Sequence, residues 1–525
     1  MNLLELDNNF LEIHQRIKKQ FPVNIVANIA FFILNVGIGI WLVPYLINHL
    51  GVAVYGLVPL ATSITAYMSL LTISLNGAVS RYLTIDLQKQ DVMIANQTFN
   101  TAFFGTLGIV LLIFPIAGLI SFFVPNILDV PVGQESNARL LFFAVMAAFL
   151  VNTVNSNFAV SSFAKNRFDL IKGVEGLGLV GRVFFIVLLF NLFSPQIGYV
   201  GLSSLGGTLV ALIFGIWIWR KLTPQLKVHL YSFTRSRLCD LTGMGGWMFI
   251  NQVAMLLFLN IDLIVVNKLF GAESGGKYAS VLQWTVLLRS MAVTLAGVLT
   301  PIILTYYTHE QMDQVLNVSK KAVKFLGLTM ALPIGFVCGF AAPLLSIWIG
   351  PKFSEFAPLM WLLVGHLCVN LAVLPLFSIQ VALNKVKIPG IVTLSMGICN
   401  FILAILLPLL FGWHIYGVAA AGAIVLTLKN ALFTPWYGAQ ILDKPWYTFI
   451  NSILPGVIAA IAVAIISFGI AHNFDQSGWI DLIISFGVIS LAYSLVVVFI
   501  VLRWDERKLL FSFIPIKLLD RKYLS

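Results

Sequence analysis

The chain has 525 residues, of which 59% are hydrophobic and only 10% are charged, and its mean hydropathy is +0.95. Soluble domains carry about 25% charged residues, so this composition excludes a protein built around a large soluble core. Apolar runs long enough to cross a bilayer as helices recur along the whole chain, and they predict an all-α polytopic membrane protein.

The predicted spans follow one another with only short connections, and there are about fourteen of them. In chain order they cover residues 23–46, 55–80, 96–123, 139–163, 171–193, 197–219, 243–266, 278–304, 322–340, 356–383, 389–411, 415–437, 449–471 and 479–502. The ninth span continues into a second apolar patch, AAPLLSIWIG, which we expect to be re-entrant or interfacial. The longest outer loop, residues 124–137, is too short for a catalytic domain, so we expect no enzyme and no catalytic residues.

Basic residues indicate the topology. About 25 of the 32 lysines and arginines fall in one set of loops, whereas the opposite loops hold only Lys268, Lys277 and Lys352. By the positive-inside rule both termini are cytoplasmic, and the net charge of +11 needs no nucleic-acid partner to explain it. We predict an N-lobe over residues 22–238, a C-lobe over 239–447, two further spans over 448–503 and a basic cytoplasmic tail over 504–525.

Residues 1–21 precede the first span. They place apolar side chains from Leu3 to Ile17 on one helical stripe and end in a basic cluster. This pattern predicts an amphipathic helix, either lying on the anionic inner leaflet or docked on its own protein.

The four cysteines give no sign of a metal or redox site. Cys239, Cys338, Cys368 and Cys399 are scattered, without a CxxC or cysteine–histidine spacing. We expect no metal and no cofactor.

An internal repeat runs through the chain at an offset of about 220 residues. INHLGVAVYG at 47–56 matches VNKLFGAESGGKY at 266–278, and QIGYVGLSSLGG at 196–207 matches HIYGVAAAG at 414–422. Between these pairs, the basic loops SSFAKNRF at 161–168 and QVALNKVK at 380–387 correspond. Because an even number of spans separates the copies, we predict two parallel, pseudo-symmetric six-helix lobes with two additional C-terminal helices, an arrangement in which substrate binds between the halves.

The stretches LINHLGVAVYGLVPLATSI, LNGAVSRYL and NIDLIVVNKLFG resemble elements of Wzx-type polysaccharide and O-antigen flippases of the multidrug/oligosaccharidyl-lipid/polysaccharide (MOP) superfamily. The resemblance implies a MATE-like MOP fold in a bacterial inner membrane. It also implies a flippase that carries an undecaprenyl-pyrophosphate-linked oligosaccharide to the outer leaflet by alternating access, for O-antigen, capsule or exopolysaccharide synthesis. The expected partners are this anionic lipid-linked oligosaccharide, the phospholipid bilayer and polysaccharide polymerase machinery.

Three cations fall inside predicted spans: Arg182, Arg289 and Lys429. An arginine or lysine at the bilayer centre costs about 2.5–3.5 kcal/mol on insertion scales, so each is expected to face a wet cavity or an ion-pair partner. In a cavity they would bind a pyrophosphate, which arginine grips bidentately. The alternative for Arg182 is a buried ion pair with Glu175.

Further candidates are weaker. Polar residues that would line the cavity are Asn24, Asn28, Asn35, Asn152, Asn155, Tyr67 and Trp284, although interhelical hydrogen bonds explain the polar stripes equally well. Asp262, near the outer end of its span, and Glu175 are candidates for ion coupling. Arg81 and Lys165 would flank the inner mouth of the cavity.

Two alternatives within the superfamily remain at this point. A multidrug exporter would carry an acid deep in the first helix, but residues 22–50 contain none. A lipid II flippase would carry arginines in that helix, and none occurs between Lys19 and Arg81. The motif Gly176-x-Gly178-x-x-Gly181 matches a dinucleotide-binding fingerprint by letter. Because it lies within a membrane span, it indicates close helix packing instead.

Overall fold

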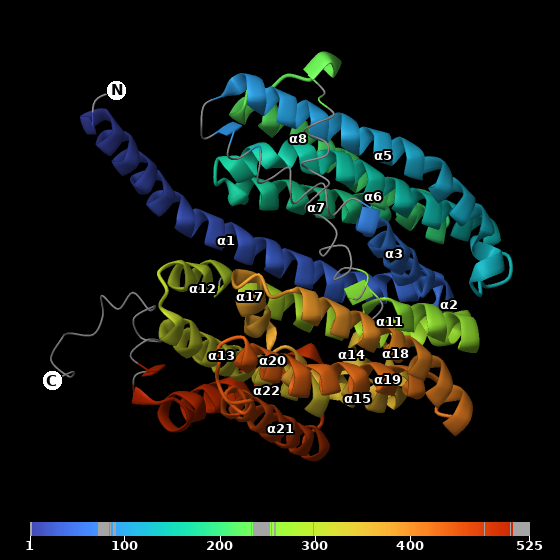
Figure 1. Cartoon of the computed structure of the whole chain (residues 1–525). Coiled ribbons are helices and arrows are strands. Elements are labelled where there is room, and N and C mark those ends of the chain that lie inside the picture. Colours follow the sequence, from blue (N-terminus) through green and yellow to red (C-terminus); the bar gives the residue numbers. More distant parts are fainter. Residues whose placement is uncertain are drawn as a thin grey trace. The chain divides into compact units, whose positions relative to one another are not determined.

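The computed structural model describes residues 3–71, 83, 86–87, 91–232, 234, 253, 255–256, 259–297, 299–476, 478–504 and 506–507. All regular elements in these ranges are helices (Figure 1). In chain order they are α1 (Leu3–Leu50), α2 (Val52–Tyr55), α3 (Leu57–Met68), η1 (Ser69–Leu71), α5 (Val92–Ile127), α6 (Glu135–Ala164), α7 (Phe168–Leu192), α8 (Ile197–Leu222), η2 (Leu230–Ser232), α11 (Ile261–Gly297), α12 (Leu299–Thr308), α13 (Met312–Gly339), α14 (Ala341–Ile349), η3 (Pro351–Phe356), α15 (Ala357–Val364), α16 (Leu367–Asn370), α17 (Leu374–Ala382), α18 (Lys387–Phe411), α19 (His414–Leu428), η4 (Lys429–Phe433), α20 (Thr434–Gln440), α21 (Ile450–Asn473), α22 (Trp479–Val496) and η5 (Val497–Val501).

The spans agree with the predicted all-α membrane architecture. Within the described ranges, 11 helices are long and apolar enough to cross a membrane, and a twelfth forms if Pro351–Asn370 and Leu374–Ala382, bent by 43°, are one span. The tenth predicted span thus contains a bend, and the patch AAPLLSIWIG forms a separate helix, α14. The total of fourteen stays a prediction, as does the placement of residues 1–21 on the leaflet. Within the described ranges, Leu3–Leu50 is one continuous helix, α1.

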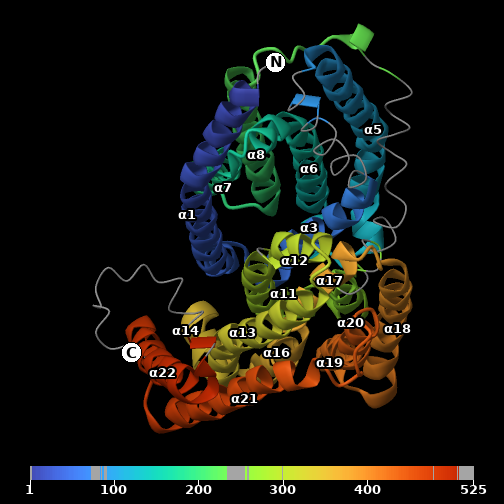
Figure 2. The same ribbon diagram turned by 60° about the vertical axis from the view of Figure 1, so that its left-hand side comes forward.

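Contacts divide the chain into two compact units, Met1–Ser280 with Gly390–Ala421 and Val281–Pro389 with Gly422–Ser525. In the first unit, α5, α6, α7 and α8 pack side by side, and α1 packs on α7 (Figure 1). In the second unit, α13 packs along α21 (Figure 2). The first unit also includes the start of α11 and most of α18, which the predicted N-lobe leaves out, so the lobe boundaries stay a prediction.

Glycines allow the closest helix contacts. A Cβ added to Gly207 of α8 would meet the backbone nitrogen of Arg182 at 2.7 Å, and one added to Gly178 of α7 would meet Gly207 O at 3.2 Å. In the second unit, a Cβ on Gly456 of α21 would lie 2.7 Å from the carbonyl carbon of Gly327 of α13. The letter pattern around Gly178 therefore serves close helix packing, as the sequence predicted.

Two glycine breaks one repeat apart have the same backbone. Gly51 ends α1 with φ 80° and ψ 161°, and Gly271 interrupts α11 with φ 85° and ψ 172°. A positive φ favours glycine, which explains the glycine in both INHLGVAVYG and VNKLFGAESGGKY. Five residues later, Gly56 and Gly276 contact each other: a Cβ on Gly56 would lie 2.7 Å from Gly276 N.

Two turns one repeat apart are also alike. Asn166 and Asn384 both have a left-handed backbone, with φ of 55° and 53°. In each turn three successive amides donate to carbonyls four, three and five residues back. These bonds are Lys165 N to Ser161 O (3.2 Å), Asn166 N to Phe163 O (2.9 Å) and Arg167 N to Ser162 O (2.8 Å), and Leu383 N to Ile379 O (2.9 Å), Asn384 N to Val381 O (3.1 Å) and Lys385 N to Gln380 O (2.8 Å). The same turn also follows α12 at Glu310, so it is a common way for these helices to end, and its presence in both loops agrees with the repeat.

Candidate functional site

Arg182 lies well inside α7, about 21 Å along the axis from Phe168 at about 1.5 Å per residue. The residue is half-buried, and its Nε is inaccessible to solvent. Within the part of the chain that the structure describes, this Nε has no hydrogen-bond partner, and no carboxylate lies within ion-pair distance of the guanidinium. Tyr55, buried at the end of α2, is the side chain in electrostatic range.

Glu175 does not neutralise Arg182. Its Oε2 lies 2.6 Å from the Nζ of Lys172, one turn earlier on the same helix, and both side chains are partly exposed. The Lys172 ammonium also lies over the Phe31 ring, 4.9 Å from its centroid. The alternative of a dry Glu175–Arg182 ion pair is therefore wrong, because the acid is held near the start of α7 by a closer cation.

Arg289 and Lys429 belong to the second unit. Arg289 lies in α11 beyond the Gly271 break, half-buried and in electrostatic range of His366. Lys429 is 5% exposed and its ammonium lies 5.1 Å from the centroid of the Phe377 ring.

The backbone around Lys429 departs from a regular helix. Lys429–Phe433 forms a π-turn between α19 and α20, and such turns are frequent at functional sites. Buried amides hold the turn in place: Asn430 Nδ2 donates to Asn370 Oδ1 at 3.0 Å, and the Thr434 hydroxyl donates to Asn430 Oδ1 at 3.1 Å. Hydropathy alone does not predict this irregularity, because the KNALF stretch continues the apolar run of α19 without a proline or glycine.

Asp262 lies in the first turn of α11. The helix continues to the break at Gly271, beyond residue 266 where the sequence predicts the span to end, so Asp262 lies about 13 Å along the axis from that break. Asn400 Nδ2 donates to Asp262 Oδ1 at 3.2 Å, and the hydroxyls of Tyr67 and Tyr278 are in electrostatic range of the carboxylate. Its position near the outer end of a membrane span stays a prediction.

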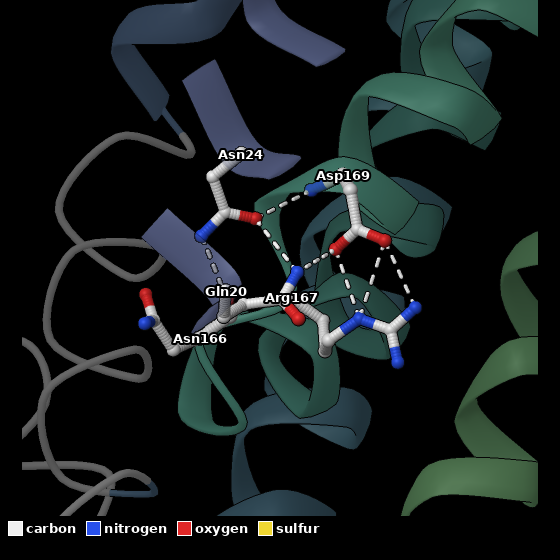
Figure 3. Close-up of polar contacts among 5 residues, drawn as sticks. All are labelled: Gln20, Asn24, Asn166, Arg167 and Asp169. Carbon is white, nitrogen blue, oxygen red and sulfur yellow. Dashed lines mark hydrogen bonds and ion pairs between the residues drawn. The ribbon is translucent and has the colours of Figure 1, made fainter. Parts of the chain in front are cut away.

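Asn24 anchors α1 to the turn between α6 and α7 (Figure 3). Its Oδ1 accepts from the Asp169 amide at 3.1 Å and from Gln20 Nε2 at 3.2 Å, and its Nδ2 donates to Asn166 O at 2.9 Å. Gln20 Nε2 also donates to Asp169 Oδ1 at 2.8 Å. These hydrogen bonds satisfy the buried Asn24 side chain within the protein. Asn24 therefore docks α1 on the turn, and no bound substrate is needed to explain its burial.

The Asp169 carboxylate in this cluster also binds Arg167. Arg167 Nε and Nη2 donate to the carboxylate of Asp169, with Nη2 2.9 Å from Oδ2. These hydrogen bonds raise the pKa of the Arg167 guanidinium. Arg167 is therefore part of the helix-docking cluster.

The other polar candidates are dispersed. Asn28 Nδ2 donates to Asn24 O at 2.8 Å within α1, and Asn155 is buried where α6 packs against Gly215 of α8. Asn35 is half-buried, Asn152 and Lys165 are exposed, and Arg81 lies outside the described residues. Trp284 is half-buried, with its ring 5.3 Å from that of Trp348. Within the described ranges, histidine, cysteine and acidic residues form no group that could hold a metal ion.

Comparison with known proteins relates this chain to membrane transporters. A family model described as polysaccharide biosynthesis protein matches residues 23–306. The uncharacterized membrane protein EpsK of Bacillus subtilis is 33% identical over 491 residues, covering 93% of this chain and 97% of EpsK.

Two solved structures are similar in fold. The lipid II flippase MurJ, in an inward closed conformation, has a TM-score of 0.64 at 15% identity and covers 90% of this chain and 98% of MurJ. An inward-facing multidrug resistance MATE family transporter of the MOP superfamily has a TM-score of 0.62 at 16% identity, covering 82% of this chain and 95% of the transporter. The predicted MOP fold is confirmed, whereas these identities are too low to choose between the two activities.

Proposed function

Given that this chain belongs to the polysaccharide biosynthesis protein family, we propose that it flips an undecaprenyl-pyrophosphate-linked oligosaccharide across the membrane by alternating access. Its fold is that of a transporter, and it is a multi-pass membrane protein without enzymatic activity. We place it in a bacterial inner membrane with both termini in the cytoplasm, supplying repeat units for O-antigen, capsule or exopolysaccharide to a polymerase on the outer side.

The observation that carries this proposal is Arg182. A guanidinium inside a membrane span, without a carboxylate partner among the described residues, needs an anion or water to offset its desolvation. A lipid pyrophosphate supplies paired oxygens that match the guanidinium fork. Arg289 and Lys429 add two further cations to the set that would bind this group.

The same charges argue against a multidrug exporter for cationic compounds. Residues 22–50 of α1 contain no aspartate or glutamate, and the cations inside the spans would repel a positively charged drug. A lipid II flippase carries a pyrophosphate too, so charge alone does not separate it from an oligosaccharide flippase. The family description favours polysaccharide synthesis.

Reconstitution tests the proposal. In proteoliposomes holding the purified full chain, a fluorescent undecaprenyl-pyrophosphate-linked oligosaccharide is expected to become accessible to a membrane-impermeant quencher faster than in empty liposomes. Ethidium transport should stay at the level of empty liposomes. Equal rates with and without protein would contradict the proposal, and rescue of cells depleted of their lipid II flippase would favour that alternative.

Asp262 is the residue we assign to ion coupling. A carboxylate in a membrane-spanning helix costs energy unless it is bound or titrates, and here it contacts an amide and lies near two tyrosines. A proton or a sodium ion would change its charge during the transport cycle. The exposed Glu175, already bound to Lys172, is a poorer choice.

An Asp262→Asn variant is expected to lose acceleration of transport by an imposed proton or sodium gradient, because the amide keeps a polar contact to Asn400 but cannot ionise. The measurement is the same quenching assay with and without each gradient. Glu175→Gln, which removes an acid of the same class, should keep the acceleration. Normal gradient dependence of Asp262→Asn would contradict this assignment.

A further inference from the structure

A polar cavity lies in the second unit, and it is separate from the cations discussed above, because neither Arg289 nor Lys429 is among its lining residues. Its volume is about 660 Å³, and its walls come from the first turns of α13, the first turns of α21 and the segment that follows η5. By the positive-inside rule, the basic residues around this cavity indicate that it opens on the cytoplasmic side of the membrane. Cavities of this size hold a headgroup or a drug-sized molecule with room beyond a single phosphate.

The walls carry a strong excess of positive charge. Lys320, Lys321, Lys324 and Arg503 line the cavity, and Glu506 is the acid among its described lining residues. Glu506 is itself engaged, because its Oε2 accepts from Lys324 Nζ at 2.6 Å and from the Arg503 amide at 2.8 Å. The side chains of Lys324 and Glu506 are 13% and 7% exposed, so this pair is a fixed part of the wall.

The start of α21 adds to the attraction for an anion. The helix begins at Ile450, and its N-cap residue, Phe449, makes no side-chain capping bond. The Ile450 and Ser452 amides already donate to Tyr447 O and Phe449 O, so the helix contributes through the partial positive charge of its N-terminus. Asn451 in the same wall supplies an amide group for uncharged parts of a ligand, whereas the Thr448 hydroxyl already donates to Pro445 O.

The surroundings of the cavity favour a lipid over a soluble anion. Pro455 and Val501 line it, and next to them in the chain the apolar side chains of Leu454 and Ile500 are 49% and 75% exposed. Such exposure on membrane-spanning helices provides a surface for acyl chains beside a cationic headgroup site. Basic pockets between helices at the cytoplasmic side bind anionic headgroups in this way.

We propose that this cavity binds the headgroup of an anionic phospholipid, which stays in the inner leaflet and is not transported. The phosphate contacts Lys320 and Arg503 near the start of α21, and the acyl chains lie along the exposed apolar residues of α21 and η5. The bound lipid joins α13, α21 and the C-terminal segment at a place where Lys324 and Glu506 already connect two of them.

Thermal unfolding of the purified full chain in mild detergent tests this site, with cardiolipin, phosphatidylcholine or sodium pyrophosphate added. Cardiolipin is expected to raise the Tm by about 3 °C or more, as a ligand that binds the folded state does. The Lys320→Gln/Arg503→Gln variant should lose most of this shift. The Arg220→Gln/Lys221→Gln variant removes the same charge from the exposed end of α8 and should keep it.

A full cardiolipin shift in the Lys320→Gln/Arg503→Gln variant would overturn the proposal. So would an equal shift with phosphatidylcholine, which lacks net charge, or with pyrophosphate, which lacks acyl chains. If the double glutamine variant is unstable without lipid, Lys320→Arg/Arg503→Lys keeps the charges and should bind cardiolipin as the wild type does. Native mass spectrometry counts the retained cardiolipin independently of stability. Equal counts for Lys320→Gln/Arg503→Gln and for the control Arg220→Gln/Lys221→Gln would also contradict the site.

Discussion

Replacing Arg182 with alanine is expected to weaken binding of the lipid-linked oligosaccharide by about tenfold to a hundredfold and to slow transport at limiting substrate by the same factor. A hydrogen bond to a charged group contributes about 1.5–3 kcal/mol, and each 1.4 kcal/mol is about tenfold in affinity. Membrane insertion should not suffer, because an arginine inside a span costs about 2.5–3.5 kcal/mol on insertion scales. The measurements are the transport rate against substrate concentration and the amount of protein in the membrane.

The control for this variant is Arg139→Ala. Arg139 is also a helix arginine with a buried Nε that lacks a hydrogen-bond partner among the described residues, but it lies in the first turns of α6 with its guanidinium 4.7 Å from the Phe122 ring centroid. Its removal should leave substrate affinity unchanged. Arg289→Ala should behave as Arg182→Ala does. Wild-type transport by both of those variants would remove the basis for an anionic substrate.

Replacing Gly276 with alanine is expected to destabilise the protein by about 1–3 kcal/mol, the usual cost of overpacking. The added Cβ would overlap the carbonyl oxygen of Val52, which is backbone and cannot rotate away. Helix propensity acts in the opposite direction, since alanine is favoured over glycine by about 1 kcal/mol in a helix interior. Thermal unfolding in detergent measures the outcome.

The neighbouring glycine provides the matched control. A Cβ on Gly275 would meet its nearest neighbour, the Cβ of Asn267, at 3.5 Å, which is an ordinary contact. Gly275→Ala should therefore keep or raise the Tm, while Gly276→Ala and Gly56→Ala lower it. A Tm for Gly276→Ala equal to that of Gly275→Ala would mean that α2 and α11 do not meet as closely as the structure has them.

The helices and the repeat were predictable because their signals are local. Long apolar runs specify helices in a bilayer, where backbone polar groups must be bonded internally. The left-handed Gly51, Gly271, Asn166 and Asn384 fall where the sequence already placed loops or turns. The bend between Pro351–Asn370 and Leu374–Ala382 depends on packing and could not be read from hydropathy.

The candidate site was only partly predictable. A charge inside an apolar run is visible in the sequence, so Arg182, Arg289 and Lys429 were found. The partners of polar residues were not visible, because they come from distant parts of the chain: Asn24 meets Asn166 and Asp169, and Asp262 meets Asn400. The cavity beside Lys320 was missed because its lysines already had an explanation as topology determinants.

The matching glycine breaks at Gly51 and Gly271 set a contrast with the buried charges. The two breaks share their backbone conformation and lie about 220 residues apart. One repeat away from Arg182, however, the sequence has Phe401, and one repeat away from Lys429 it has Ala211. The backbone is thus repeated while these cations are not, so an anionic cargo would meet unequal charge on the two copies of the repeat.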